Sequence, residues 1–122
     1  IIFLGDRQDL PELLNVFDIY IFTSKWESFG IMMLEVLATK VPVVGFEVPG
    51  NREIIQKGGG GILIEERDHG KVAKIAVDLL EDNKKYNELS KEGYLNVQKN
   101  FSVQKTIKIL EEEYSLLLKE EF

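Results

Sequence analysis

The chain has 122 residues, of which 44% are hydrophobic and 30% are charged, and its formal net charge at pH 7 is -6. These values are typical of a folded globular domain and exclude a disordered tail. The acidic balance, without a basic stripe, argues against nucleic-acid binding. The absence of cysteine excludes disulfides and thiolate metal sites, and the single histidine argues against a histidine-rich metal site or a Ser-His-Asp triad.

Short apolar runs alternate with helical patterns through the first half of the chain. Four of these runs are typical of buried strands, at residues 1–5, 19–23, 42–46 and 62–64. They are apolar on both faces, which indicates a parallel sheet covered on both sides by helices. We therefore predict an α/β fold of the Rossmann-like, three-layer αβα type, with about four strands.

Helices are expected between and after these strands. Asp9 is the predicted N-cap of the first helix, with Pro11 in its first turn. The next two helices are predicted at about 29–39 and 51–57. The chain beyond Asp68 is predicted to be helical cover, and Ser102 is the predicted cap of a last helix at about 102–120. We expect residues 1–122 to form one unit.

The loop between the second strand and its helix has features of a ligand site. Ligands of open parallel sheets bind outside the carboxyl ends of the strands. Ser28 is the expected cap of the helix, which leaves the backbone N–H groups of Phe29, Gly30 and Ile31 at its start. Free donors and the partial positive charge of a helix N-terminus suit a phosphate, and a glycine lets an anion approach the backbone closely.

Two carboxylates accompany this helix start. Glu27 is placed in the loop, within reach of a sugar, while Glu35 is expected at the edge of the core, where it can accept hydrogen bonds from the paired hydroxyls of a ribose. The loop after the third strand adds a second helix start, with Asn51 as the expected cap and Glu53 as a further polar group.

Each of these features alone has a simpler interpretation. Ordinary helix capping explains Gly30, Gly50 and the helix starts better than ligand binding does. A single loop glutamate such as Glu27 is usually a solvated surface residue, and Arg7 is by default a surface charge. The case for a site depends on their combination.

The combination resembles the C-terminal domain of the retaining glycosyltransferases of group 1, or family 4, which have the two-domain GT-B fold. Its strongest element runs from Glu27-Ser28-Phe29-Gly30 to Glu35, where members commonly have Glu-Gly-Phe-Gly, so Ser28 is a mild departure. The remaining matches are weaker and follow the family's order and spacing: residues 3–5, 10–14, 42–44, 50–54, 61–64 and 100–102.

The resemblance implies transfer of a sugar from a nucleotide diphosphate sugar to a glycan, lipid or other acceptor, with anomeric retention and without a metal or cofactor. It implies that Glu27 is catalytic and contacts the transferred sugar, and that Glu35 binds the ribose. The other residues that it places in the donor site are Asp6 and Arg7 beside the base, Phe29, Gly30 and Ile31 at the diphosphate, and Gly50, Asn51 and Glu53 at the sugar end. The implied setting is polysaccharide biosynthesis in the cytoplasm, with peripheral association of the whole enzyme at the inner face of the membrane.

The family pattern also implies what this chain does not carry. Family domains have about six strands in the order 3-2-1-4-5-6, and the four predicted here match the third to sixth. The acceptor-binding N-terminal domain, and an Arg and a Lys that members bring to the diphosphate, would precede Ile1. The run at 1–5 would then pair with 19–23, meet another chain, or meet residues outside this sequence. We expect the chain to be a partial nucleotide-sugar-binding domain that self-associates or is poorly stable alone, and that has no transferase activity by itself.

Three alternatives remain at this point. One is a non-catalytic nucleotide-sugar-binding or regulatory module of the same fold, against which the intact Glu27 and Glu35 argue. A receiver-type signalling domain has the same layer pattern, but the acidic cluster and lysine that it needs are not found at the required spacing. A GT-B nucleotide-sugar epimerase matches the motifs less well.

Overall fold

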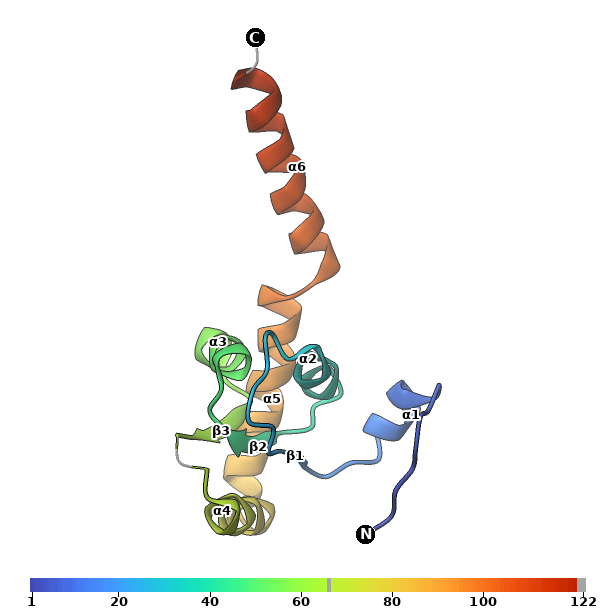
Figure 1. Ribbon diagram of the computed structural model, residues 1–122, viewed down its shortest axis with the longest axis vertical. Helices are drawn as coiled ribbons and strands as arrows, with labels where there is room; N and C mark the ends of the chain where they lie inside the picture. Colours follow the sequence, from blue (N-terminus) through green and yellow to red (C-terminus); the bar gives the residue numbers. More distant parts are fainter. Residues whose placement is uncertain (66, 121–122) are drawn as a thin grey trace.

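The protein is described by a computed structural model that covers residues 1–65 and 67–120. Within these residues the sheet has three parallel strands in the order β1-β2-β3 (Figure 1). The strands are β1 Tyr20–Phe22, β2 Val43–Phe46 and β3 Gly61–Ile64. The helices are α1 Leu10–Leu14, α2 Ile31–Ala38, α3 Pro49–Gly58, α4 His69–Glu81, α5 Asn83–Asn100 and α6 Val103–Glu120. The predicted α/β class with a parallel sheet is confirmed.

The central strand β2 supplies the core on both faces of the sheet, because successive side chains of a strand point to opposite sides. Val43 packs with residues of α2 and α3, such as Leu37 and Ile54. Val44 and Phe46 pack on the other face against α4. Figure 1 shows α2 and α3 on one side of the strands and α4 on the other. All four residues of β2 are buried, which explains why the run is apolar throughout.

Helix α5 packs against α2, α3 and α4, and its approach to the sheet depends on glycine. A Cβ atom on Gly93 would lie 2.6 Å from Leu37 Cδ2 and 3.0 Å from Gly60 Cα. The turn that it meets, Gly59 and Gly60, has φ angles of 81° and 105°, which side chains disfavour. Gly59 is the C-cap of α3, so the glycine run before β3 caps a helix and turns the chain, as its position after a helix indicates.

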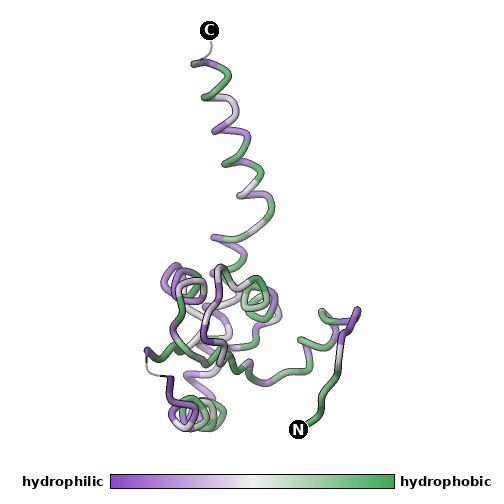
Figure 2. The backbone as a smooth tube through the Cα atoms, in the orientation of Figure 1, coloured by the Kyte–Doolittle hydropathy of each residue, from purple (hydrophilic) through white to green (hydrophobic). Residues whose placement is uncertain are grey.

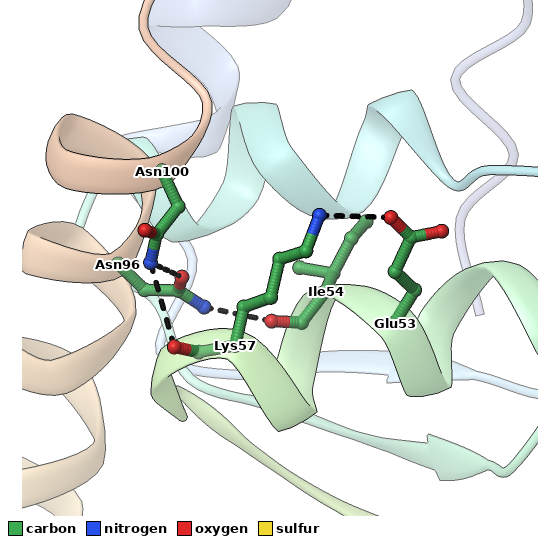
Figure 3. A network of polar contacts seen from close by, with 5 residues as sticks. All are labelled: Glu53, Ile54, Lys57, Asn96 and Asn100. Atoms are coloured by element: carbon green, nitrogen blue, oxygen red, sulfur yellow. Dashed lines mark hydrogen bonds and ion pairs between the residues drawn. The ribbon is translucent and has the colours of Figure 1, made fainter.

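Two asparagines of α5 complete the end of α3 (Figure 3). The buried Asn96 donates from Nδ2 to the carbonyl oxygens of Ile54 at 2.8 Å and Gly59 at 3.1 Å. Asn100 Nδ2 in turn donates to Asn96 Oδ1 at 2.9 Å. Because these bonds join the last turns of α3 and the glycine that follows it to α5, they fix the C-terminal end of α3 against α5.

The predicted first strand is wrong. Residues 1–5 form neither a helix nor a strand, and Phe3 is 93% exposed. β1 pairs only with β2, so nothing in the described sheet lies on its outer side. A buried parallel strand needs a hydrogen-bonded neighbour and a covering layer, and this run has neither among the described residues. The sheet therefore has three strands there, not about four.

Helix α6 extends away from the sheet and the helices that cover it (Figures 1 and 2). None of its side chains from Val103 to Lys119 is buried, although apolar residues line one side of the helix at the expected spacing. The predicted cap of the last helix, Ser102, is confirmed, and Asp68 caps α4 in the same way. Asp68 accepts a hydrogen bond from the Lys71 N–H at 3.0 Å, and Ser102 Oγ accepts one from the Lys105 N–H at 3.3 Å. Among the described helices, none combines the length and apolar character needed to cross a membrane.

Candidate functional site

The loops that follow β1 and β2 meet at the carboxyl end of the sheet, backbone against backbone. The Gly50 N–H donates to the Glu27 carbonyl oxygen at 3.2 Å. A Cβ atom on Gly50 would lie 2.7 Å from the Phe29 nitrogen and 2.8 Å from the Ser28 carbonyl carbon. A side chain at position 50 would therefore push the two loops apart. The contact brings the N-termini of α2 and α3 together, which is the geometry that the two predicted helix starts required.

Helix α2 begins after a glycine in the left-handed region. Gly30 has a φ of 83° and is the N-cap, and Ile31 is the first helical residue. The prediction that Ser28 caps this helix is wrong, because the chain enters the helix two residues later. No side chain caps the first turn, and a helix in that state presents its first backbone N–H groups outward. This turn can hold an anion such as a phosphate.

The carboxylate of Glu27 lies at this helix start in a partly buried position. Its Oε1 accepts a hydrogen bond from the Ser28 N–H at 3.1 Å. Burial, together with the nearby charge of Glu27, raises the pKa of the Tyr20 hydroxyl at the start of β1. No lysine or arginine within residues 1–65 and 67–120 forms an ion pair with Glu27, so its oxygens can accept hydrogen bonds from ligand hydroxyls. Tyr20 was missed by the sequence analysis, since a tyrosine in a buried strand looks like core.

Glu35 is exposed on α2, so its predicted place at the edge of the core is wrong. Glu35 is instead one of the residues that line a 290 Å³ hollow between α1 and α2. The floor of this hollow includes the buried Leu14 as well as Leu10. A carboxylate in a hollow with an apolar lining can accept hydrogen bonds from a ligand that packs its other atoms on the leucines.

Asp6 and Arg7 border a second hollow, of 350 Å³, which reaches Tyr20 and Met32 at the start of α2. Arg7 is paired with Asp9, with Nε donating to Oδ1 at 2.7 Å. The hydrogen bond from Arg7 lowers the pKa of the Asp9 carboxyl. Asp9 is the N-cap of α1, as predicted, but its side chain makes no cap bond, since its carboxylate is paired with Arg7.

Asn51 does not cap α3. The helix begins at Pro49, with Val48 as its N-cap, since proline is favoured at the first helical position. The side chain of Asn51 is fully buried instead. Glu53 lies on the outer side of the same helix, where its Oε1 pairs with Lys57 Nζ at 2.8 Å (Figure 3). The structure therefore brings Gly50 and Asn51 to the helix start at Gly30 and leaves Glu53 in an ion pair.

The described residues contain no group of three or more His, Cys, Asp or Glu side chains arranged to hold a metal ion. The site consists of two helix N-termini in contact, a carboxylate beside them, and hollows on the α1 side of α2. Partial positive charge at the centre and carboxylates at the sides suit an elongated ligand with an anionic middle and hydroxyl-bearing ends.

The sequence model of the family described as "Glycosyl transferases group 1" matches residues 1–96. The chain belongs to this family, and its fold is that of a GT-B glycosyltransferase domain. The resemblance seen in the sequence is thereby confirmed.

Two curated relatives match nearly the whole chain. N-acetyl-alpha-D-glucosaminyl L-malate synthase of Bacillus anthracis is 33% identical over 121 residues, which cover 99% of this chain and 32% of that protein. The lipopolysaccharide core biosynthesis mannosyltransferase LpsB of Rhizobium meliloti is 26% identical, over 98% of this chain and 34% of its own length. The chain thus spans about a third of the length of these relatives.

Solved structures give the same picture. The C-terminal domain of the glycosyl transferase group 1 family protein LpcC from Francisella tularensis superposes with a TM-score of 0.71 and 27% identity, covering 84% of this chain and 53% of that one. The Anabaena protein HepE, crystallised with UDP and glucose, superposes with a TM-score of 0.78 and 26% identity, covering 89% of this chain and 30% of that one.

Proposed function

We propose that this chain is part of the donor-binding domain of a retaining glycosyltransferase, which transfers a sugar from a nucleotide diphosphate sugar to a glycan, lipid or other acceptor. The observation that carries the proposal is the contact between Gly50 and the segment from Glu27 to Phe29. This contact joins two helix N-termini beside a carboxylate that has no basic partner among the described residues.

The proposed donor lies across this helix start with its diphosphate at the centre. The first N–H groups of α2, at Gly30 and Ile31, bind phosphate oxygens, and the adjacent start of α3 adds to the positive potential. Departure of the nucleoside diphosphate leaves negative charge on these oxygens, so donors fixed in advance lower the barrier to transfer. In this proposal the cations that complete the charge balance come from residues outside this chain.

The two ends of the donor are assigned to the two carboxylates. Glu27 accepts hydrogen bonds from the transferred sugar near the reacting carbon. Glu35 accepts hydrogen bonds from the ribose hydroxyls, with the nucleoside over the hollow between α1 and α2. Asp6 and Arg7 border the neighbouring hollow, on the side proposed for the base. The complex of HepE with UDP and glucose supports a nucleotide sugar as the ligand class.

A calorimetric titration of the full-length protein with UDP-, GDP- and ADP-sugars tests this proposal. One of the three is expected to bind, and Glu35→Ala is expected to weaken that binding about 10- to 100-fold, because hydrogen bonds to a charged group contribute roughly 1.5–3 kcal/mol each. Glu88→Ala, which removes an exposed carboxylate of α5, is the matched control and is expected to bind like the wild type. Absence of binding by all three donors would refute the proposal.

Turnover distinguishes an enzyme from a non-catalytic binding module of the same fold. If the full-length protein transfers sugar, Glu27→Gln is expected to lower kcat about 100-fold and to leave the affinity for the free nucleoside diphosphate nearly unchanged. Donor binding without turnover would favour the regulatory module. The 122-residue chain alone is expected to be inactive, and measurable transfer by it would contradict this part of the proposal.

A further inference from the structure

The side chain of Asn51 is buried and unpaired. It has no exposed surface, and neither Nδ2 nor Oδ1 has a hydrogen-bond partner within residues 1–65 and 67–120. Buried polar groups in native proteins are nearly always paired, so each exception requires an explanation. Asn96, the other buried asparagine among the described residues, shows the usual behaviour, since it donates to two carbonyl groups and accepts from Asn100. We therefore infer that the amide of Asn51 forms hydrogen bonds in a conformation other than this one.

The amide lies directly beneath the start of α2. A Cβ atom placed on Gly30 would be 2.8 Å from Asn51 Oδ1 and 3.6 Å from Glu27 Cγ. A side chain at position 30 would therefore meet both the amide of Asn51 and the side chain of Glu27. Because Gly30 has no side chain, the amide of Asn51 lies close to the backbone of the segment that carries Glu27.

The segment from Glu27 to Gly30 can supply the missing partners. Its backbone already contacts the first turn of α3 through the Gly50 N–H and the close approach of Phe29. An asparagine amide donates and accepts at the same time, so it can pair with both an N–H and a carbonyl group of this segment. The uncapped first turn of α2 and the partial positive charge at the start of α3 also favour an anion at this place.

We propose that Asn51 is a positioning residue of the donor site, an inference that rests on the function proposed above. When a nucleotide diphosphate sugar is bound, the segment from Glu27 to Gly30 pairs with the buried amide, and this fixes the Glu27 carboxylate against the sugar. Asn51 does not touch the substrate and acts through Gly30. It is therefore needed for turnover more than for holding the nucleotide, which contacts α2 farther along at Glu35.

The test uses the full-length protein and the variant Asn51→Leu, whose side chain has nearly the same size and shape but no polar atoms. Gln56→Ala removes an exposed amide from the same helix and is the matched control. Three quantities are measured for each protein: the thermal midpoint without ligand, the dissociation constants for UDP, GDP and ADP, and kcat with the corresponding glucose or mannose donors.

Asn51→Leu is expected to change kcat without a matching loss of stability or nucleotide affinity. Without ligand, Asn51→Leu melts at the same temperature as the wild type or higher, because an unpaired buried amide is replaced by an apolar group of the same shape. The dissociation constant of the nucleoside diphosphate changes by less than about threefold, while kcat falls about 100-fold, the effect of a misplacement of about 1 Å at a reacting centre. Gln56→Ala matches the wild type in all three.

Two results would overturn the inference alone. One is a kcat of Asn51→Leu within about threefold of the wild type. The other is a lower thermal midpoint with kcat and affinity reduced together, which would make Asn51 a structural residue. If the wild type binds none of the nucleoside diphosphates or their sugars, the proposed function fails and the inference fails with it.

Discussion

The two ends of the chain, residues 1–5 and α6, have apolar patterns like those of the sheet and its covering helices. Unlike the sheet and those helices, the two ends are exposed. Leu37 of α2 is fully buried, whereas Leu117 of α6 is 58% exposed, although both lie on helices with apolar residues at helical spacing. In the same way, β2 is buried and the apolar run at residues 1–5 is exposed. An apolar pattern therefore predicts whether a segment is a helix or a strand. It does not predict burial, because burial also requires another segment that packs against it.

The largest expected effect tests this comparison directly. Leu37→Ala is expected to lower the free energy of unfolding of the 122-residue protein by about 3 kcal/mol, because it opens a cavity between α2 and α5. Leu117→Ala removes the same atoms from α6 and is expected to change the free energy of unfolding by less than about 0.5 kcal/mol. Urea denaturation measures both, and equal effects would show that α6 is packed in solution.

Asn96→Ala is expected to lower the free energy of unfolding by about 2 kcal/mol. The carbonyl groups of Ile54 and Gly59 lose the amide that donates to them and remain inside the protein. Asn87→Ala is the control on the same helix. Its Nδ2 donates to the Asn83 carbonyl at 2.8 Å on the exposed surface, so its loss is expected to cost under about 0.5 kcal/mol. A small effect at Asn96 would mean that α5 does not fix α3.

The exposed apolar residues of the ends are expected to make the 122-residue protein self-associate. Sedimentation velocity is expected to show concentration-dependent dimers or larger species. Replacing Phe3 and Leu110 by lysine is expected to shift the distribution toward monomer with little change in the stability of the sheet. A wild-type protein that sediments as a monomer at all concentrations would contradict this prediction.

The smallest expected effect concerns pH. Burial and the charge of Glu27 raise the pKa of Tyr20 in the folded protein. The folded state then holds the phenolic proton more tightly than the unfolded state, so the contribution of Tyr20 is complete below pH ~10 and is lost as the pH rises above that value. Tyr20→Phe is expected to flatten the decline in stability above about pH 10, measured by urea denaturation. Part of the decline is expected to remain in this variant, because the pKa of Tyr86 is also raised.

Much of the fold could be predicted from the sequence. The runs that became β1, β2 and β3 are short, apolar on both faces and separated by helical patterns, which is typical of a parallel sheet with two covering layers. The same argument failed at residues 1–5, because a strand is defined by hydrogen bonds to a neighbour and the composition of one segment cannot supply that neighbour.

The candidate site was predictable in outline but not in detail. The glycine contact between the two loops follows from Gly30 and Gly50, whose positions after strands were visible in the sequence. The N-caps of α2 and α3 could not be predicted, because serine, asparagine and glycine are all common N-cap residues and only the backbone angles decide among them. At α3 the signal was present, since Pro49 marks the first helical residue and places Asn51 inside the helix.

The position of α5 also has a consequence for the order of events during folding. Ser90 Oγ donates to the Lys40 carbonyl across 50 residues of chain, and Asn96 reaches Ile54 across 42. The first two strands and the helices beside them are therefore complete in sequence long before the helix that covers them exists. On the ribosome, the part of α2 that α5 covers stays exposed until residue 96 has emerged from the exit tunnel, a delay of a few seconds at about 5–20 residues per second.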